Sequence, residues 1–80
     1  HLAHPRAEKP TQLITMCLHP DLDQCVEIAL RDMIVWIVDR TGLSREDAYM
    51  LCSLAGDLRI TQTVNGNKGV HMMMQTALLT

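Results

Sequence analysis

Hydrophobic and polar residues alternate along the chain with two different periods, and the changes of period divide it into elements. Residues 12–18 (QLITMCL) are apolar and β-branched at the density of a strand. The His-Pro-Asp triplet after them is typical of a turn and of entry into a helix. The segment before them contains Pro5 and Pro10, which disfavour regular structure. We therefore predict a strand over residues 12–18 and an extended arm or linker over residues 1–11.

A long helix is predicted over residues 22–40. Apolar side chains recur there at helical spacing, and Gly42 supplies the usual stop. The stripe consists of Leu22, Val26, Ala29, Leu30, Met33 and Ile37. Because Ile28 and Val35 fall outside the stripe, this helix is expected to be buried on more than one side.

A second helix and a β-hairpin complete the pattern. Ser44 is the predicted N-cap of the helix, acidic residues follow in its first turn, and Gly56 ends it. Residues 57–64 (DLRITQTV) then alternate strictly, Asn-Gly gives a strong hairpin turn, and residues 70–75 (VHMMMQ) return as the partner strand. The first strand is expected to carry Leu58, Ile60 and Val64 on one face, and the second to carry Val70, Met72 and Met74 on one of its own. The predicted fold class is α+β, in the order strand, two helices, β-hairpin.

Composition limits the possible partners. The chain has 80 residues, of which 48% are hydrophobic and 20% charged, and its net charge is −2, which does not fit a disordered tail. Lys and Arg form no cluster, so we expect neither nucleic acid nor an anionic membrane as a partner, because phosphate recognition needs concentrated positive charge. No run reaches the roughly 18 apolar residues that span a bilayer, and residues 1–10 (HLAHPRAEKP) do not have the pattern of a signal peptide. A cytoplasmic protein is therefore expected.

The predicted elements have more apolar surface than they are able to hide. A single domain of this size buries only about 60% of its unfolded surface. A helix that is apolar on two sides and a methionine-rich strand exceed what one layer of helices on a sheet covers. The chain also begins at His1 instead of Met, which indicates a processed or recombinant product, or a piece of a longer polypeptide. We expect further polypeptide or a partner to cover the surplus.

Few residues are candidates for chemistry, and each has a structural alternative. Asp57 lies where the second helix meets a strand, a common place for functional carboxylates, but it is also positioned to bond local amides or Arg59. His71 is either a surface histidine or a ligand or proton carrier. Cys52 is expected in the core, since no histidine or basic cluster adjoins it in sequence. The three cysteines match no zinc or redox spacing, and the three adjacent methionines indicate packing and not a copper site.

Residues 29–74 (ALRDMIVWIVDRTGLSREDAYMLCSLAGDLRITQTVNGNKGVHMMM) strongly resemble the C-terminal region of the acetamidase/formamidase family of amide hydrolases. The most specific blocks are residues 33–53 and 55–64, and with the preceding LITMCLHPDLDQCVEIALRDMI the resemblance covers residues 12–74. It implies hydrolysis of short linear amides, such as acetamide or formamide, to the carboxylate and ammonia. It also implies a much longer, mainly-β, homo-oligomeric enzyme. Residues 12–80 would be its C-terminal α+β segment, mainly structural and oligomer-forming, with the remaining polypeptide, identical subunits and a small amide as partners.

The resemblance also limits the site. The part of the family pattern that is rich in His, Asp and Glu, near a Gly-Asp-His segment, lies upstream and has no counterpart here. No metal ligand is carried over, so a divalent metal such as zinc would be bound outside this chain. Asp57, in the AGDLRI block, is the one position carried over as a catalytic, site-proximal candidate, with Cys52 and Arg59 as neighbours of unassigned role. Two alternatives stay open: a non-catalytic self-associating or partner-binding module, and a metal-binding regulatory domain built on His71, Asp57 and a cysteine.

Overall fold

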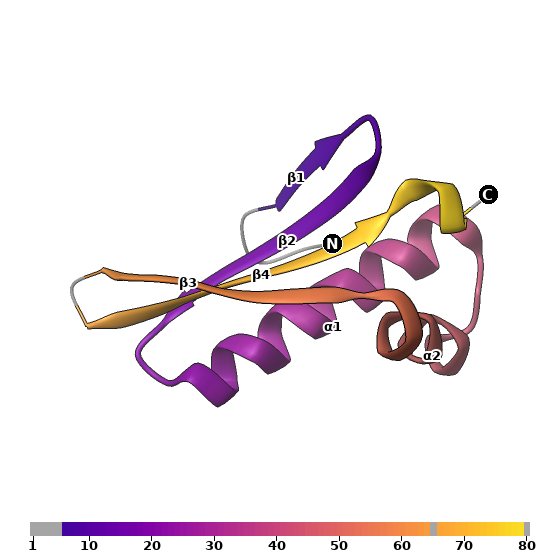
Figure 1. The fold of residues 1–80 in the computed structure, drawn as a ribbon. Coiled ribbons are helices and arrows are strands. Elements are labelled where there is room, and N and C mark those ends of the chain that lie inside the picture. Colours follow the sequence, from indigo (N-terminus) through magenta and orange to yellow (C-terminus); the bar gives the residue numbers. More distant parts are fainter. Residues whose placement is uncertain (1–5, 65, 80) are drawn as a thin grey trace.

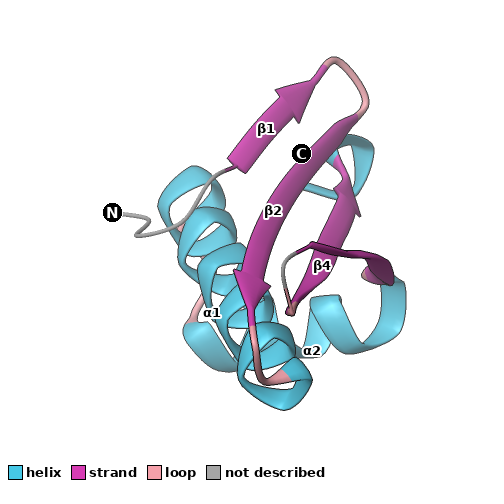
Figure 2. Ribbon diagram, turned by 90° about the vertical axis from the view of Figure 1, so that its left-hand side faces the viewer, coloured by secondary structure: helices cyan, strands magenta, loops and turns pink. Residues whose placement is uncertain are grey.

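The computed structural model, which describes residues 6–64 and 66–79, has a four-stranded antiparallel sheet with two α-helices on one face (Figures 1 and 2). The elements are β1 (Arg6–Lys9), β2 (Gln12–His19), α1 (Leu22–Thr41), α2 (Arg45–Ala55), β3 (Asp57–Val64), β4 (Asn67–Gln75) and the 3-10 helix η1 (Thr76–Leu79). The strands lie in the order β1-β2-β4-β3, so β1 and β3 are the edges. The predicted α+β class is confirmed.

The N-terminal arm is more ordered than the sequence predicted. Strand β1 pairs with β2, with Ala7 opposite Ile14. Pro10 lies in the turn between the two strands, where its missing N–H removes no ladder hydrogen bond. Residues 6–9 therefore belong to the sheet and not to a linker, while residues 1–5 lie outside the described part of the chain.

Both helices begin and end as predicted, because their capping residues are in place. The Asp21 carboxylate accepts hydrogen bonds from two backbone N–H groups in the first turn of α1, and Gly42 ends that helix with φ of 79°. Ser44 caps α2 by accepting from the N–H of Asp47 at 3.1 Å. Among the described residues, no helix combines the length and the apolar composition that crossing a bilayer requires.

The core lies between α1 and the two central strands. Alternation in β4 is confirmed, since Val70, Met72 and Met74 are buried while His71 and Met73 are half-buried on the other face. The Thr15 hydroxyl of β2 donates to the Ala29 carbonyl of α1 at 2.8 Å and ties the sheet to the helix. The other core side chains come from β2, α1 and α2: Leu13, Cys17, Cys25, Ala29, Met33, Ile34, Trp36, Ile37, Ala48 and Cys52.

Helix α1 is buried across a wider arc than its apolar stripe, as the sequence predicted. The residues responsible are not those that led to the prediction, because Ile28 and Val35 are only half-buried. The arc is widened by Asp32 and Trp36 on one flank and by Ile34 on the other. Trp36 lies under strand β1, where the Arg6 guanidinium stacks 4.6 Å from its ring centre.

The predicted apolar faces of the two hairpin strands lie on the same side of the sheet, but that of β3 is only partly covered. Leu58 and Ile60 lie opposite Met72 and Val70 and so face the helices, yet they are 39% and 62% exposed. The reason is that β3 is an edge strand and α2 packs mainly against α1 and β4. In the turn, Gly66 has φ of 81°, while Asn65 lies outside the described residues, as does the Val64 side chain.

Candidate functional site

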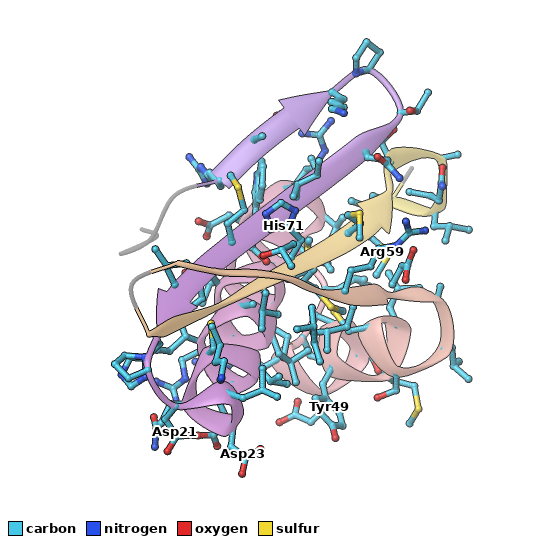
Figure 3. All side chains as sticks on the ribbon, turned by 60° about the vertical axis from the view of Figure 1, so that its left-hand side comes forward. Asp21, Asp23, Tyr49, Arg59 and His71 are labelled. Carbon is cyan, nitrogen blue, oxygen red and sulfur yellow. The ribbon has the colours of Figure 1, made fainter. Side chains whose placement is uncertain are left out.

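The open face of the sheet, opposite the helices, carries the residues that the sequence singled out. Asp57 and Arg59 of β3 pair with Met73 and His71 of β4. Residues directly opposite in an antiparallel ladder point to the same side, so these four side chains share the open face. Figure 3 shows Arg59 and His71 beside the hairpin, away from Asp21, Asp23 and Tyr49 on the helical layer.

Asp57 is the first residue of β3 and forms an ion pair with Arg59. The Arg59 Nε donates to the Asp57 oxygen Oδ2 at 3.2 Å, and Nη2 lies 3.1 Å from the same oxygen. The side chains are 53% and 70% exposed. A pair this exposed contributes only about 0–1 kcal/mol to stability, so its main effect is to orient the carboxylate. This is the structural role that the sequence left open beside the catalytic one.

Gly56 determines where Asp57 begins its strand. Its N–H donates to the Cys52 carbonyl at 2.9 Å, which closes the end of α2. A Cβ at this position would lie 2.6 Å from the Cys52 carbonyl oxygen and would overlap Cε of Met72. The chain therefore passes so close to the core that only glycine fits without a shift. The AGDLRI block thus has a steric reason for the glycine before Asp57.

The histidines have different surroundings. His71 lies between Met16 of β2 and Arg59 of β3 in the ladder, so no carboxylate stands opposite it in either strand. The Asp57 carboxylate lies diagonally from His71 on the same face, one pair along the ladder. His19 ends β2, and its Nδ1 accepts a hydrogen bond from the Asp21 N–H at 3.0 Å. It therefore ends the strand and holds the turn before α1, where the sequence predicted a turn.

The cysteines belong to the core. All three are buried and none forms a disulfide. Burial raises the pKa of the Cys52 thiol to about 11. Burial, together with the adjacent Cys25 thiol, raises the pKa of Cys17 to about 12. Both thiols are therefore protonated and weakly nucleophilic near neutral pH, which confirms Cys52 as a core residue.

A metal centre built on His71, Asp57 and a cysteine is contradicted by the fold. Asp57 and His71 lie on the open face, whereas the cysteines are buried between the sheet and the helices. Among the described residues, no three His, Cys, Asp or Glu side chains come together as metal ligands. This part of the chain therefore does not fit a divalent metal.

A hollow on the helical layer was not predicted from the sequence. Ile34 of α1 and residues of α2 line a shallow, open hollow of about 400 Å³ there. The residues of α2 are Arg45, Glu46, Tyr49 and Met50. None of the candidates for chemistry lines it. Helical spacing could have indicated it. Tyr49 and Met50 do not share a helix face with the buried Ala48 and Cys52, so their large side chains point to the outer surface of α2.

Solved structures of longer proteins contain the same fold. An acetamidase from Yersinia enterocolitica is 32% identical, with a TM-score of 0.91, over 100% of this chain and 24% of its own. An acetamidase from Bacillus halodurans is 31% identical, with a TM-score of 0.84, over 96% of this chain and 26% of its own. The chain is an acetamidase/formamidase-like segment. A predicted acetamidase/formamidase from Thermoanaerobacter tengcongensis agrees, at 29% identity and a TM-score of 0.82 over 99% of this chain and 26% of its own.

This acetamidase/formamidase-like segment thus spans about a quarter of the length of those proteins, 24–26%. No protein-family model matches it, and no curated protein matches it. Its described residues offer one oriented carboxylate, one guanidinium and one histidine on an open sheet face.

Proposed function

We propose that this chain is the C-terminal α+β segment of a hydrolase that cleaves short linear amides, of the acetamide or formamide type, to the carboxylate and ammonia. The observation that supports the proposal is the likeness of almost the entire chain to acetamidase structures at TM-scores of 0.82–0.91 and identities of 29–32%. The remaining three-quarters of an enzyme of that length would supply most of the site. Identical subunits and a cytoplasmic location form part of the proposal.

Amide hydrolysis needs an activated water and a group that stabilises the developing oxyanion. In this proposal Asp57 lies next to the reaction centre as the catalytic candidate, and Arg59 holds its carboxylate in place. The hydrogen bond from the Gly56 N–H to the Cys52 carbonyl ties that junction to the end of α2. Because the described residues do not fit a divalent metal, water activation is not assigned to a metal bound by this segment.

A chimaera tests the proposal. This chain would replace the matching quarter of the Yersinia enterocolitica acetamidase, and ammonia release from acetamide and formamide would be measured. We expect the chimaera to hydrolyse at least one of the two amides. A folded chimaera, with a cooperative thermal transition, that releases ammonia from neither amide would contradict the proposed function.

The same chimaera tests the role of Asp57. Asp57→Asn removes the carboxylate that the proposal places beside the reaction centre, so it is expected to lower kcat by more than tenfold. The fold is expected to remain intact, because loss of an exposed ion pair costs only about 0–1 kcal/mol of stability. Asp23→Asn is the matched control, since Asp23 is exposed on α1, away from the open face. Equal kcat values for the two variants would leave Asp57 with its structural role alone.

A non-catalytic self-associating module is the second candidate function. It is favoured by the exposed apolar side chains of α2 and β3, among them Leu54 at 80% and Ile60 at 62%. Sedimentation velocity of the 80-residue chain discriminates between the candidates. A discrete oligomer, together with an inactive but folded chimaera, would favour the module.

A further inference from the structure

The two edges of the sheet differ in how they are protected. Strand β1 has four residues, and its Arg6 and Glu8 point to the helical side, opposite Thr15 and Leu13. Arg6 stacks on Trp36, and Glu8 accepts from Arg40 at 3.1 Å. A short strand with charged side chains is a usual way to prevent a further strand from pairing. We therefore expect no further strand to pair with β1.

Strand β3 has none of that protection on its helical side. It has eight residues, and it pairs only with β4 among the described strands (Figure 1). Leu58 and Ile60 point toward the helices but remain exposed, since neither helix extends beneath this edge. Its charged residues, Asp57 and Arg59, pair with each other on the open face. A long edge strand with exposed apolar side chains is a template for another strand.

We propose that β3 is a docking edge on which an extended segment of the remaining polypeptide pairs as a fifth strand. The inference rests on the proposed function, since the solved acetamidases that contain this fold are about four times as long, the chain covering 24–26% of each. The added strand carries apolar side chains toward the helical layer, where they cover Leu58 and Ile60. Its alternate, polar side chains face the ion pair of Asp57 and Arg59.

The test compares one substitution in two settings. In the 80-residue chain, Ile60→Lys is expected to change Tm by less than about 3 °C, because the side chain is already exposed. In the chimaera with the Yersinia enterocolitica acetamidase, the same change buries an unpaired ammonium and is expected to lower Tm or to abolish soluble expression. Leu18→Lys, at a side chain that is 55% exposed on β2, is the matched control and should leave Tm unchanged in both settings.

Hydrogen exchange gives a second measurement that does not depend on the chimaera. In the Yersinia enterocolitica acetamidase itself, the peptide that matches residues 57–64 should be as protected as the one that matches β4. In the 80-residue chain, about half of the β3 amides should exchange quickly, because alternate residues of an edge strand point their N–H groups outward. Fast exchange of the matching peptide in the intact acetamidase would overturn the inference.

Further outcomes separate the possibilities. An 80-residue dimer that Ile60→Lys dissociates would make a second copy the occupant of the edge and would overturn the inference. Equal Tm values for the chimaera with and without Ile60→Lys would also overturn it. Protected β3 amides in a folded chimaera that hydrolyses neither amide would support the docking edge while the proposed function fails.

Discussion

Gly56→Ala tests whether close packing at the junction of α2 and β3 places Asp57. The backbone at Gly56 has φ of −69° and ψ of 145°, which alanine adopts without strain, so any loss of stability is steric. The new Cβ would lie 2.6 Å from the Cys52 carbonyl oxygen and would overlap Cε of Met72. The carbonyl is fixed by its hydrogen bond with the Gly56 N–H, and Met72 is only 3% exposed, so it moves only at the expense of the core.

The magnitude follows from two opposing terms. Forcing an extra methyl into a packed core costs about 1–3 kcal/mol. Replacing glycine restricts the unfolded chain and returns about 0.4–1 kcal/mol. The net loss is about 1–2 kcal/mol in the free energy of unfolding, or roughly 4–16 °C in Tm for a domain of this length.

Thermal and urea unfolding of the 80-residue chain, followed by circular dichroism, measures the loss. The control is the same substitution in a Met72→Ala background, where the overlapping Cε is absent. We expect Gly56→Ala to cost less in that background, and the difference is the coupling between the two positions. If Gly56→Ala leaves the free energy of unfolding unchanged in both backgrounds, the steric account of the AGDLRI block is wrong.

Three smaller predictions concern the core and the helix caps. Thr15→Val removes the buried bond to the Ala29 carbonyl and should lower the free energy of unfolding in urea by about 1 kcal/mol; no change would mean that the hydroxyl is dispensable. Asp21→Ala removes the cap of α1 and should cost about 1 kcal/mol, measured in the same way, and equal midpoints at constant m-value would contradict it. Burial raises the pKa of Cys17 and Cys52 from the ordinary 9.0 to about 12 and about 11, so the folded state retains these protons longer. Their contribution to stability should be complete below pH 9 and lost as pH rises toward 11–12. In urea titrations at increasing pH, the free energy of unfolding of a Cys52→Ala variant should therefore fall less steeply than that of the unmodified chain.

The element boundaries were predictable because the signals that set them are local. Asp21, Ser44 and Gly42 act within one helical turn of their own positions, and the structure places each of them in its capping role. Alternation in β4 also held, because a strand with two unlike faces has only one way to lie on a core. Asp57 and Arg59 were recognised as a possible pair from their spacing of two residues in a strand, which puts both side chains on one face.

Burial was less predictable, because it depends on which elements lie above a strand. Leu58 and Ile60 have the alternation of core residues, but their exposure results from α2 packing beside α1 and not beneath the edge. The pairing of β1 was missed for a similar reason. Its four residues are mostly charged, and the Trp36 ring and Arg40 of α1 give Arg6 and Glu8 their partners. These contacts join positions about 30 residues apart in the sequence, so a local pattern of hydrophobic and polar residues does not predict them.

The location of the exposed apolar side chains connects packing with the candidate site. Isolated apolar residues on a surface are ordinary and indicate nothing. Here, among the described residues, five of the eight large exposed ones belong to the consecutive elements α2 and β3: Tyr49, Met50, Leu54, Leu58 and Ile60. The junction between those elements is where Asp57 stands. A strand that pairs along β3 would begin or end beside this junction, with the Asp57 carboxylate on the face opposite Leu58 and Ile60. The proposed docking edge and the proposed site-proximal Asp57 therefore concern adjacent parts of the chain.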